Sequence, residues 1–98
     1  MPKVIFHRLI RKDLDGVLSY YERESGSALA DRFFESFLSV VEKALNDPRH
    51  FHVAAGVLRR ANLPDFPYHF LYREKPFGIR VLVLRHDRRH PDFGLRRR

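Results

Sequence analysis

The spacing of the apolar residues changes once along this chain, and that change limits the folds it can adopt. Residues 9–24 and 27–46 each carry an apolar stripe at helical spacing, which predicts two amphipathic helices. Ser27 is suited to cap the second helix, and Asn46-Asp47-Pro48 is suited to end it. Because only Ser25-Gly26 separates the two stripes, the helices are expected to form an antiparallel hairpin.

The second half of the chain shows the alternation of apolar and polar residues that is typical of strands. Three such segments, 57–61, 66–72 and 79–84, are separated by the turn signals of residues 62–65 and 75–78. They predict a three-stranded antiparallel meander, and residues 3–7 predict a short strand near the amino terminus.

Alternation along residues 79–84 also predicts which side of this strand is buried. Ile79, Val81 and Val83 are expected to share one wholly apolar face, with Arg80 on the other. The helical hairpin is expected to cover the apolar face.

Length and composition are those of one globular domain spanning residues 1–98. The chain has 98 residues, of which 44% are apolar, and this is enough for a single core. It has no cysteine, which excludes disulfides, thiolate zinc sites and thiol nucleophiles. Neither a signal peptide nor an apolar run of ~20 residues is found, so a cytoplasmic protein without a membrane partner is expected.

The positive charge is confined to the carboxyl-terminal half. Residues 1–56 contain eight Lys/Arg and eight Asp/Glu, whereas residues 57–98 contain eleven against four, which is the whole net charge of +7. Such a field attracts nucleic acid, an acidic protein or an anionic surface, and charge alone does not choose among them.

The six histidines do not show the spacing of a metal site, so neither a metal nor another cofactor is expected. A nuclease that cleaves RNA through its 2′-hydroxyl needs a base, a cation and an acid. His69 and Arg80 lie on neighbouring predicted strands, and a shared sheet face is expected to bring them together. His86 and Arg88 are further candidates for this chemistry.

Several segments resemble the RelE/ParE toxins of bacterial type II toxin–antitoxin modules. The resemblance rests on "LRRANLPDFPYHFLYR" and on the ending "LRHDRRHPDF", preceded by "DLDGVLSYYERES" and "LADRFFESFLSVVEKALNDPRHF" in the usual order. It implies an α+β fold, in which an amino-terminal strand and a helical hairpin pack on an antiparallel sheet of about four strands. It also implies a growth-inhibiting toxin of plasmid-stabilisation type that a cognate antitoxin neutralises.

The resemblance leaves two targets, because RelE-like toxins cut messenger RNA on the ribosome and ParE-like toxins inhibit DNA gyrase. This chain has His69 and Asp87 where the nuclease branch has arginines, and Phe93 near the position of its terminal tyrosine. These departures favour a ParE-like gyrase inhibitor without nuclease chemistry. The alternative is a ribosome-dependent endoribonuclease with a rearranged site. The expected contacts with target or partner are Arg60, Arg80, His86, Arg88, Arg89, Phe93, Arg96 and Arg97.

Overall fold

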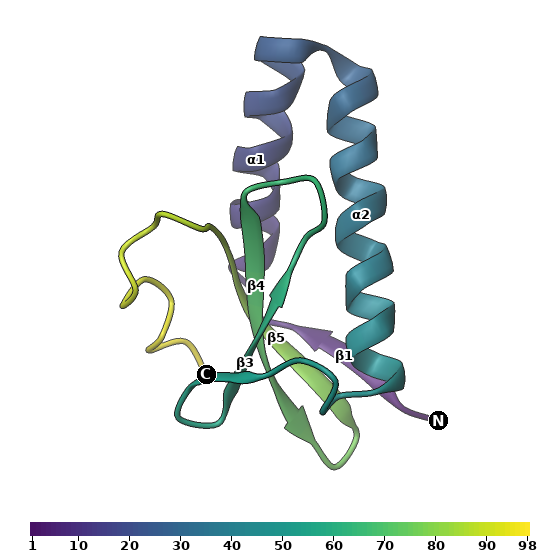
Figure 1. Cartoon of the computed structure of the whole chain (residues 1–98), viewed down its shortest axis with the longest axis vertical. Coiled ribbons are helices and arrows are strands. Elements are labelled where there is room, and N and C mark those ends of the chain that lie inside the picture. Colours follow the sequence, from purple (N-terminus) through teal and green to yellow (C-terminus); the bar gives the residue numbers. More distant parts are fainter.

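Two long helices form the predicted hairpin. In the computed structural model, which describes residues 1–98, α1 spans Ile10–Ser25 and α2 spans Ser27–Asn46. Gly26 alone joins them, with a φ of 91° that a residue with a side chain rarely adopts, and its N–H bonds to the carbonyl of Glu22. Figure 1 shows the helices side by side, reaching beyond one end of the sheet.

Five strands form one sheet. They are β1 (Lys3–Phe6), β2 (Val53–Ala55), β3 (Leu58–Asn62), β4 (Tyr68–Lys75) and β5 (Gly78–His86). Their spatial order is β1-β5-β4-β3-β2, in which β1 runs parallel to β5 and the other neighbours are antiparallel. The expected α+β architecture and meander are therefore confirmed. The fifth strand, β2, is a three-residue edge strand, too short to produce a recognisable alternation.

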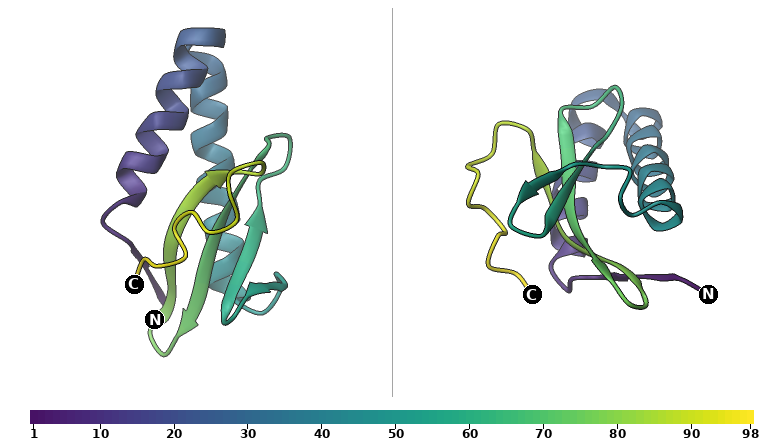
Figure 2. Two further views of the ribbon diagram at one scale, coloured as in Figure 1. Left: turned by 90° about the vertical axis from the view of Figure 1, so that its left-hand side faces the viewer. Right: turned by 60° about the horizontal axis from the view of Figure 1, so that its bottom comes forward.

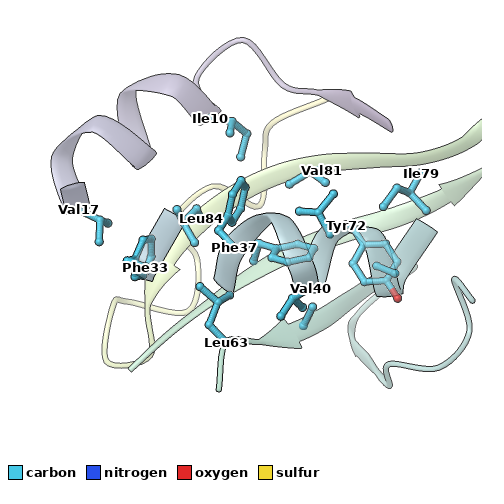
Figure 3. Close-up of a cluster of buried hydrophobic side chains, with 14 residues drawn as sticks. Ile10, Val17, Phe33, Phe37, Val40, Leu63, Tyr72, Ile79, Val81 and Leu84 are labelled. Atoms are coloured by element: carbon cyan, nitrogen blue, oxygen red, sulfur yellow. The ribbon is translucent and has the colours of Figure 1, made fainter. Parts of the chain in front are cut away.

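The core lies between α2 and the sheet. Phe33 and Phe37 of α2 belong to one buried cluster with Phe70 and Tyr72 of β4, and Figure 3 shows this cluster. The rings of Phe37 and Phe70 meet edge-on, with centroids 5.7 Å apart. Burial raises the pKa of Tyr72 to about 12, so its hydroxyl stays protonated and donates to the carbonyl of Pro48 at 2.6 Å.

A β-bulge corrects the predicted orientation of β5. The pairing of β4 with β5 shifts by one position, which leaves Leu82 as an extra residue in β5. One extra residue exchanges the two faces of a strand from that point onward. Ile79 and Val81 face the helices as expected, but Leu84 joins the core cluster in the place that simple alternation assigned to Val83.

The carboxyl-terminal segment after β5, residues 87–98, is called the tail below. It crosses the sheet on the face opposite α2, in turns without a strand or helix (Figure 2). Gly94 touches this face so closely that an added Cβ would lie 2.6 Å from the Val83 side chain. The sheet is therefore a middle layer, with helices on one face and the tail on the other.

Candidate functional site

Four polar side chains are connected by hydrogen bonds where the tail leaves the sheet. We call this network of Arg60, His69, Arg85 and Asp87 the polar chain. His69 on β4 faces Arg85 on β5, since the two residues are direct cross-strand partners. The Nε of Arg85 donates to Nε2 of His69 at 2.9 Å, and Nδ1 of His69 lies 2.8 Å from Oδ1 of Asp87. Arg60 on β3 completes the chain, with its Nη2 3.3 Å from the same carboxylate oxygen.

The hydrogen-bond partners of His69 show which of its ring nitrogens carries the hydrogen. Arg85 can only donate, so Nε2 of His69 is the acceptor and Nδ1 carries the hydrogen that is donated to Asp87. The side chain is 1% exposed, and burial lowers the pKa of His69, although the hydrogen bond that His69 donates to Asp87 partly offsets this effect. His69 is therefore neutral at neutral pH, with both ring nitrogens occupied.

Arg85 also fastens the start of the tail. Its Nη1 donates to the carbonyls of Pro91 and Phe93 at 2.7 and 2.8 Å. One guanidinium thus joins the neutral His69 ring to two turns of the tail, a use to which its planar fork of donors is suited.

A second arginine fastens the end of the tail to α1. Arg97 and Asp13 form a bidentate ion pair at 2.5 and 3.1 Å, and their side chains are 12% and 7% exposed. Oδ2 of Asp13 also accepts the N–H of Leu84, and Arg97 donates to the carbonyl of Leu82. β1 pairs with β5 only as far as Val81, so this pair satisfies main-chain groups of β5 that have no strand beside them.

The cations of the tail differ in their exposure. Arg88, Arg89 and Arg96 are exposed, and the guanidinium of Arg89 lies over the ring of Phe93 at 3.9 Å from its centroid. His86 is half-buried, with its ring against Tyr68 at 5.0 Å and its Nδ1 accepting the N–H of Arg88 at 3.0 Å.

Arg80 lies in a separate place from the polar chain. It is paired with Arg73 across β4 and β5, five residues along the strand from Arg85, which is roughly 16 Å. The expectation that the sheet brings His69 and Arg80 together is therefore wrong, because the register places Arg85 opposite His69. Arg80 instead donates to the main-chain oxygen of Arg98 at 2.6 Å.

The expected site residues thus fall into four groups. Arg60 and His69 belong to the polar chain, Arg97 belongs to the ion pair with α1, and Arg80 lines a groove described below. The exposed group consists of Arg88, Arg89 and Arg96, with Phe93 beneath Arg89.

Asp13 and Arg85 were missed as partners of the tail. Asp13 is 84 positions from Arg97 in the chain, and no local pattern indicates such a pair. No cluster of three or more metal-ligating side chains is present, and neither helix is long and apolar enough to cross a membrane.

Comparison with known proteins gives a family match and matches to several solved structures. A family described as "ParE toxin of type II toxin-antitoxin system, parDE" matches residues 4–91. A solved structure described as "Chromosomal ParDE TA system from P. aeruginosa" superposes with a TM-score of 0.77 at 18% identity, over 88% of this chain and 96% of that chain. At this identity the likeness shows a shared fold. No curated protein matches the chain.

Proposed function

Because this chain belongs to the family of ParE toxins of type II toxin–antitoxin systems, we propose that it inhibits DNA gyrase by binding, without nuclease chemistry. We propose also that a cognate antitoxin neutralises it. The proposal rests on the side chains that are available to a ligand on the tail and on the sheet face opposite the helices.

The state of His69 carries the argument against RNA cleavage. Removal of the 2′-hydroxyl proton needs a ring nitrogen with a free lone pair within reach of the substrate. His69 is 1% exposed, its Nε2 accepts from Arg85, and its Nδ1 hydrogen is given to Asp87. It supports the fold of the tail and has no nitrogen left for a substrate.

The other two groups that a nuclease needs, a cation for the phosphate and an acid, are also sparse around the polar chain. Asp87 puts a carboxylate where the nuclease branch has an arginine, so this position offers no cation to a phosphate, and the carboxylate already engages Arg60. Phe93 has no hydroxyl to serve as an acid, and its ring is covered by Arg89. The geometry therefore favours a protein that acts by contact.

The proposed contact surface is the outer side of the tail. Arg88, Arg89 and Arg96 project from a segment that Arg85 and Arg97 hold against the sheet. Arginines on a main chain that is held in place suit an acidic patch on a protein target, because less main-chain freedom is lost on binding.

A supercoiling assay with purified gyrase and the full-length chain tests the target. We expect supercoiling to fall as the protein is added, and full supercoiling at saturating protein would overturn the proposal. Messenger RNA on ribosomes should stay intact in parallel incubations. If it is cut and the His86→Ala variant does not cut it, the nuclease alternative is correct, because His86 keeps one ring nitrogen free.

A further inference from the structure

A second basic region lies away from the polar chain, between the turn that joins β2 and β3, the β4–β5 hairpin and the end of the tail. It is a groove of about 780 Å³, within the size range of ligand sites. Its lining includes the cations Arg73, Lys75, Arg80, Arg97 and Arg98, and no aspartate or glutamate. We call it the basic groove.

Most of the cations in the basic groove lack a carboxylate partner. Arg97 is bound to Asp13, and Arg80 donates only to the main-chain oxygen of Arg98. Arg73 makes no ion pair or hydrogen bond, and its Nε is buried without an acceptor. Arg73 and Arg80 are moreover direct cross-strand partners, an arrangement that costs stability because the charges are alike.

Anionic groups in the groove would relieve the repulsion between Arg73 and Arg80, which destabilises the free protein. A buried donor without an acceptor costs free energy comparable to a lost hydrogen bond, and a carboxylate would supply that acceptor. The charges of the groove therefore call for an anionic ligand.

The apolar part of the lining decides which anionic ligand fits. Seven of the 13 lining residues are hydrophobic, among them Ile5, Leu82, Leu95 and the strongly exposed Val57. Nucleic-acid grooves stack bases on free aromatic rings, but Phe77 is the one aromatic residue here and Lys3 lies over its ring. Aliphatic side chains beside arginines instead suit a peptide that carries both carboxylates and apolar residues.

We propose that the basic groove binds an extended acidic and apolar segment of the antitoxin. This inference rests on the proposed function for the existence of that partner, and it adds the site and the chemistry of the bound segment. Carboxylates of the segment pair with Arg73 and Arg80, and its apolar side chains cover Val57 and Leu95. The antitoxin segment thus binds at a surface separate from Arg88, Arg89 and Arg96, the cations proposed to contact the target.

Fluorescence anisotropy with the full-length chain tests the groove. The probe is a labelled peptide of about ten residues in which Glu alternates with Ala and Leu, and its control has Gln in place of Glu. We expect the Glu peptide to bind and Arg73→Gln to weaken it about tenfold, the value of one charge-assisted hydrogen bond. Arg88→Gln is the matched control, since it removes the same charge outside the groove, and it should change the affinity less than about twofold.

Thermal unfolding adds a readout that separates binding from folding. Removal of one of two facing arginines relieves repulsion, so Arg73→Gln should unfold at the same or a higher temperature than the wild type. Equal binding of the Glu and Gln peptides would overturn the proposal, as would equal losses in the two variants. The groove would instead be assigned to nucleic acid if a labelled single-stranded DNA bound more tightly than the Glu peptide and Arg73→Gln abolished that binding.

The peptide assay contains no gyrase, so the two proposals fail separately. If the protein binds the Glu peptide but leaves gyrase active, the groove proposal stands and the proposed target is wrong. If the protein inhibits gyrase but does not bind the Glu peptide, the proposed target stands and the groove proposal is wrong.

Discussion

At the scale of single residues, the ion pair between Arg97 and Asp13 is the polar contact with the largest expected effect on stability. Both side chains are nearly buried, and the same carboxylate also accepts the N–H of Leu84. Arg97→Ala would leave this carboxylate without its cation. We expect the free energy of unfolding to fall by about 3 kcal/mol, as for other buried pairs that lose one partner. Urea unfolding measures this change.

Arg96→Ala is the control for that substitution. Arg96 precedes Arg97 in the chain but is exposed and makes no ion pair, so its loss should change stability by less than about 0.5 kcal/mol. Equal effects of the two substitutions would mean that the pair with α1 does not hold the tail.

The neutral state of His69 makes stability depend on pH. Burial lowers the pKa of His69 and also that of His7, so the unfolded chain takes up protons at a higher pH than the folded chain. The stability that these groups contribute is present above the unfolded pKa of about 6.5 and is lost as the pH falls toward the folded values. Protonation would also put a hydrogen on Nε2 of His69, where Arg85 already donates.

Unfolding in urea at about pH 7.5 and about pH 5.5 tests this dependence, with lower stability expected at the lower pH. His69→Gln should lose part of the dependence, because the amide cannot be protonated in this range. His50→Gln, at an exposed position, should keep it. A wild-type protein of equal stability at both values would contradict the assignment of a neutral His69.

At the scale of elements, the packing of the tail on the sheet depends on Gly94. Its φ is 82°, and an added Cβ would lie within 3 Å of three atoms of Val83. We therefore expect Gly94→Ala to lift the tail from the sheet and to destabilise the protein by more than about 1 kcal/mol. Trypsin should then cut the tail sooner than in the wild type.

Gly16→Ala provides the opposite control. Gly16 lies inside α1 with no atom near its absent side chain, so alanine should stabilise the protein by about 0.5–1 kcal/mol. If both alanine variants had the same effect, the close approach to Val83 would not be what requires glycine at position 94.

The elements also show what the sequence alone can predict. α2 spans the residues that its apolar stripe predicts, because this signal is local. The expected cap is wrong, because Ser27 is the first helical residue, Gly26 is the N-cap residue and no side chain bonds there. The bulge at Leu82 is set by the pairing of β5 with β4, and it changes which side chain enters the core. The site was less predictable for the same reason, since His69 meets Arg85 only in the register that the bulge produces.

At the scale of the whole molecule, charge is separated along the chain and in space. The helical hairpin lies in the half with no net charge, whereas the strands β3 to β5 and the tail carry the excess of +7. Figure 1 shows that the far end of the hairpin lies well away from the tail. A target with an acidic patch should therefore be approached by the sheet and tail, with a rate that falls as salt is added.

Two double variants of equal net charge test this orientation. Arg88→Gln with Arg96→Gln removes two exposed cations of the tail, and Arg23→Gln with Arg32→Gln removes two exposed cations of the hairpin. We expect the tail variant to need about tenfold more protein to inhibit gyrase, equivalent to about 1.4 kcal/mol, and the hairpin variant less than about twofold. The difference should shrink at high salt, because exposed charges are screened. Equal losses would show that only net charge matters, and no loss in either would place the target contact on another face.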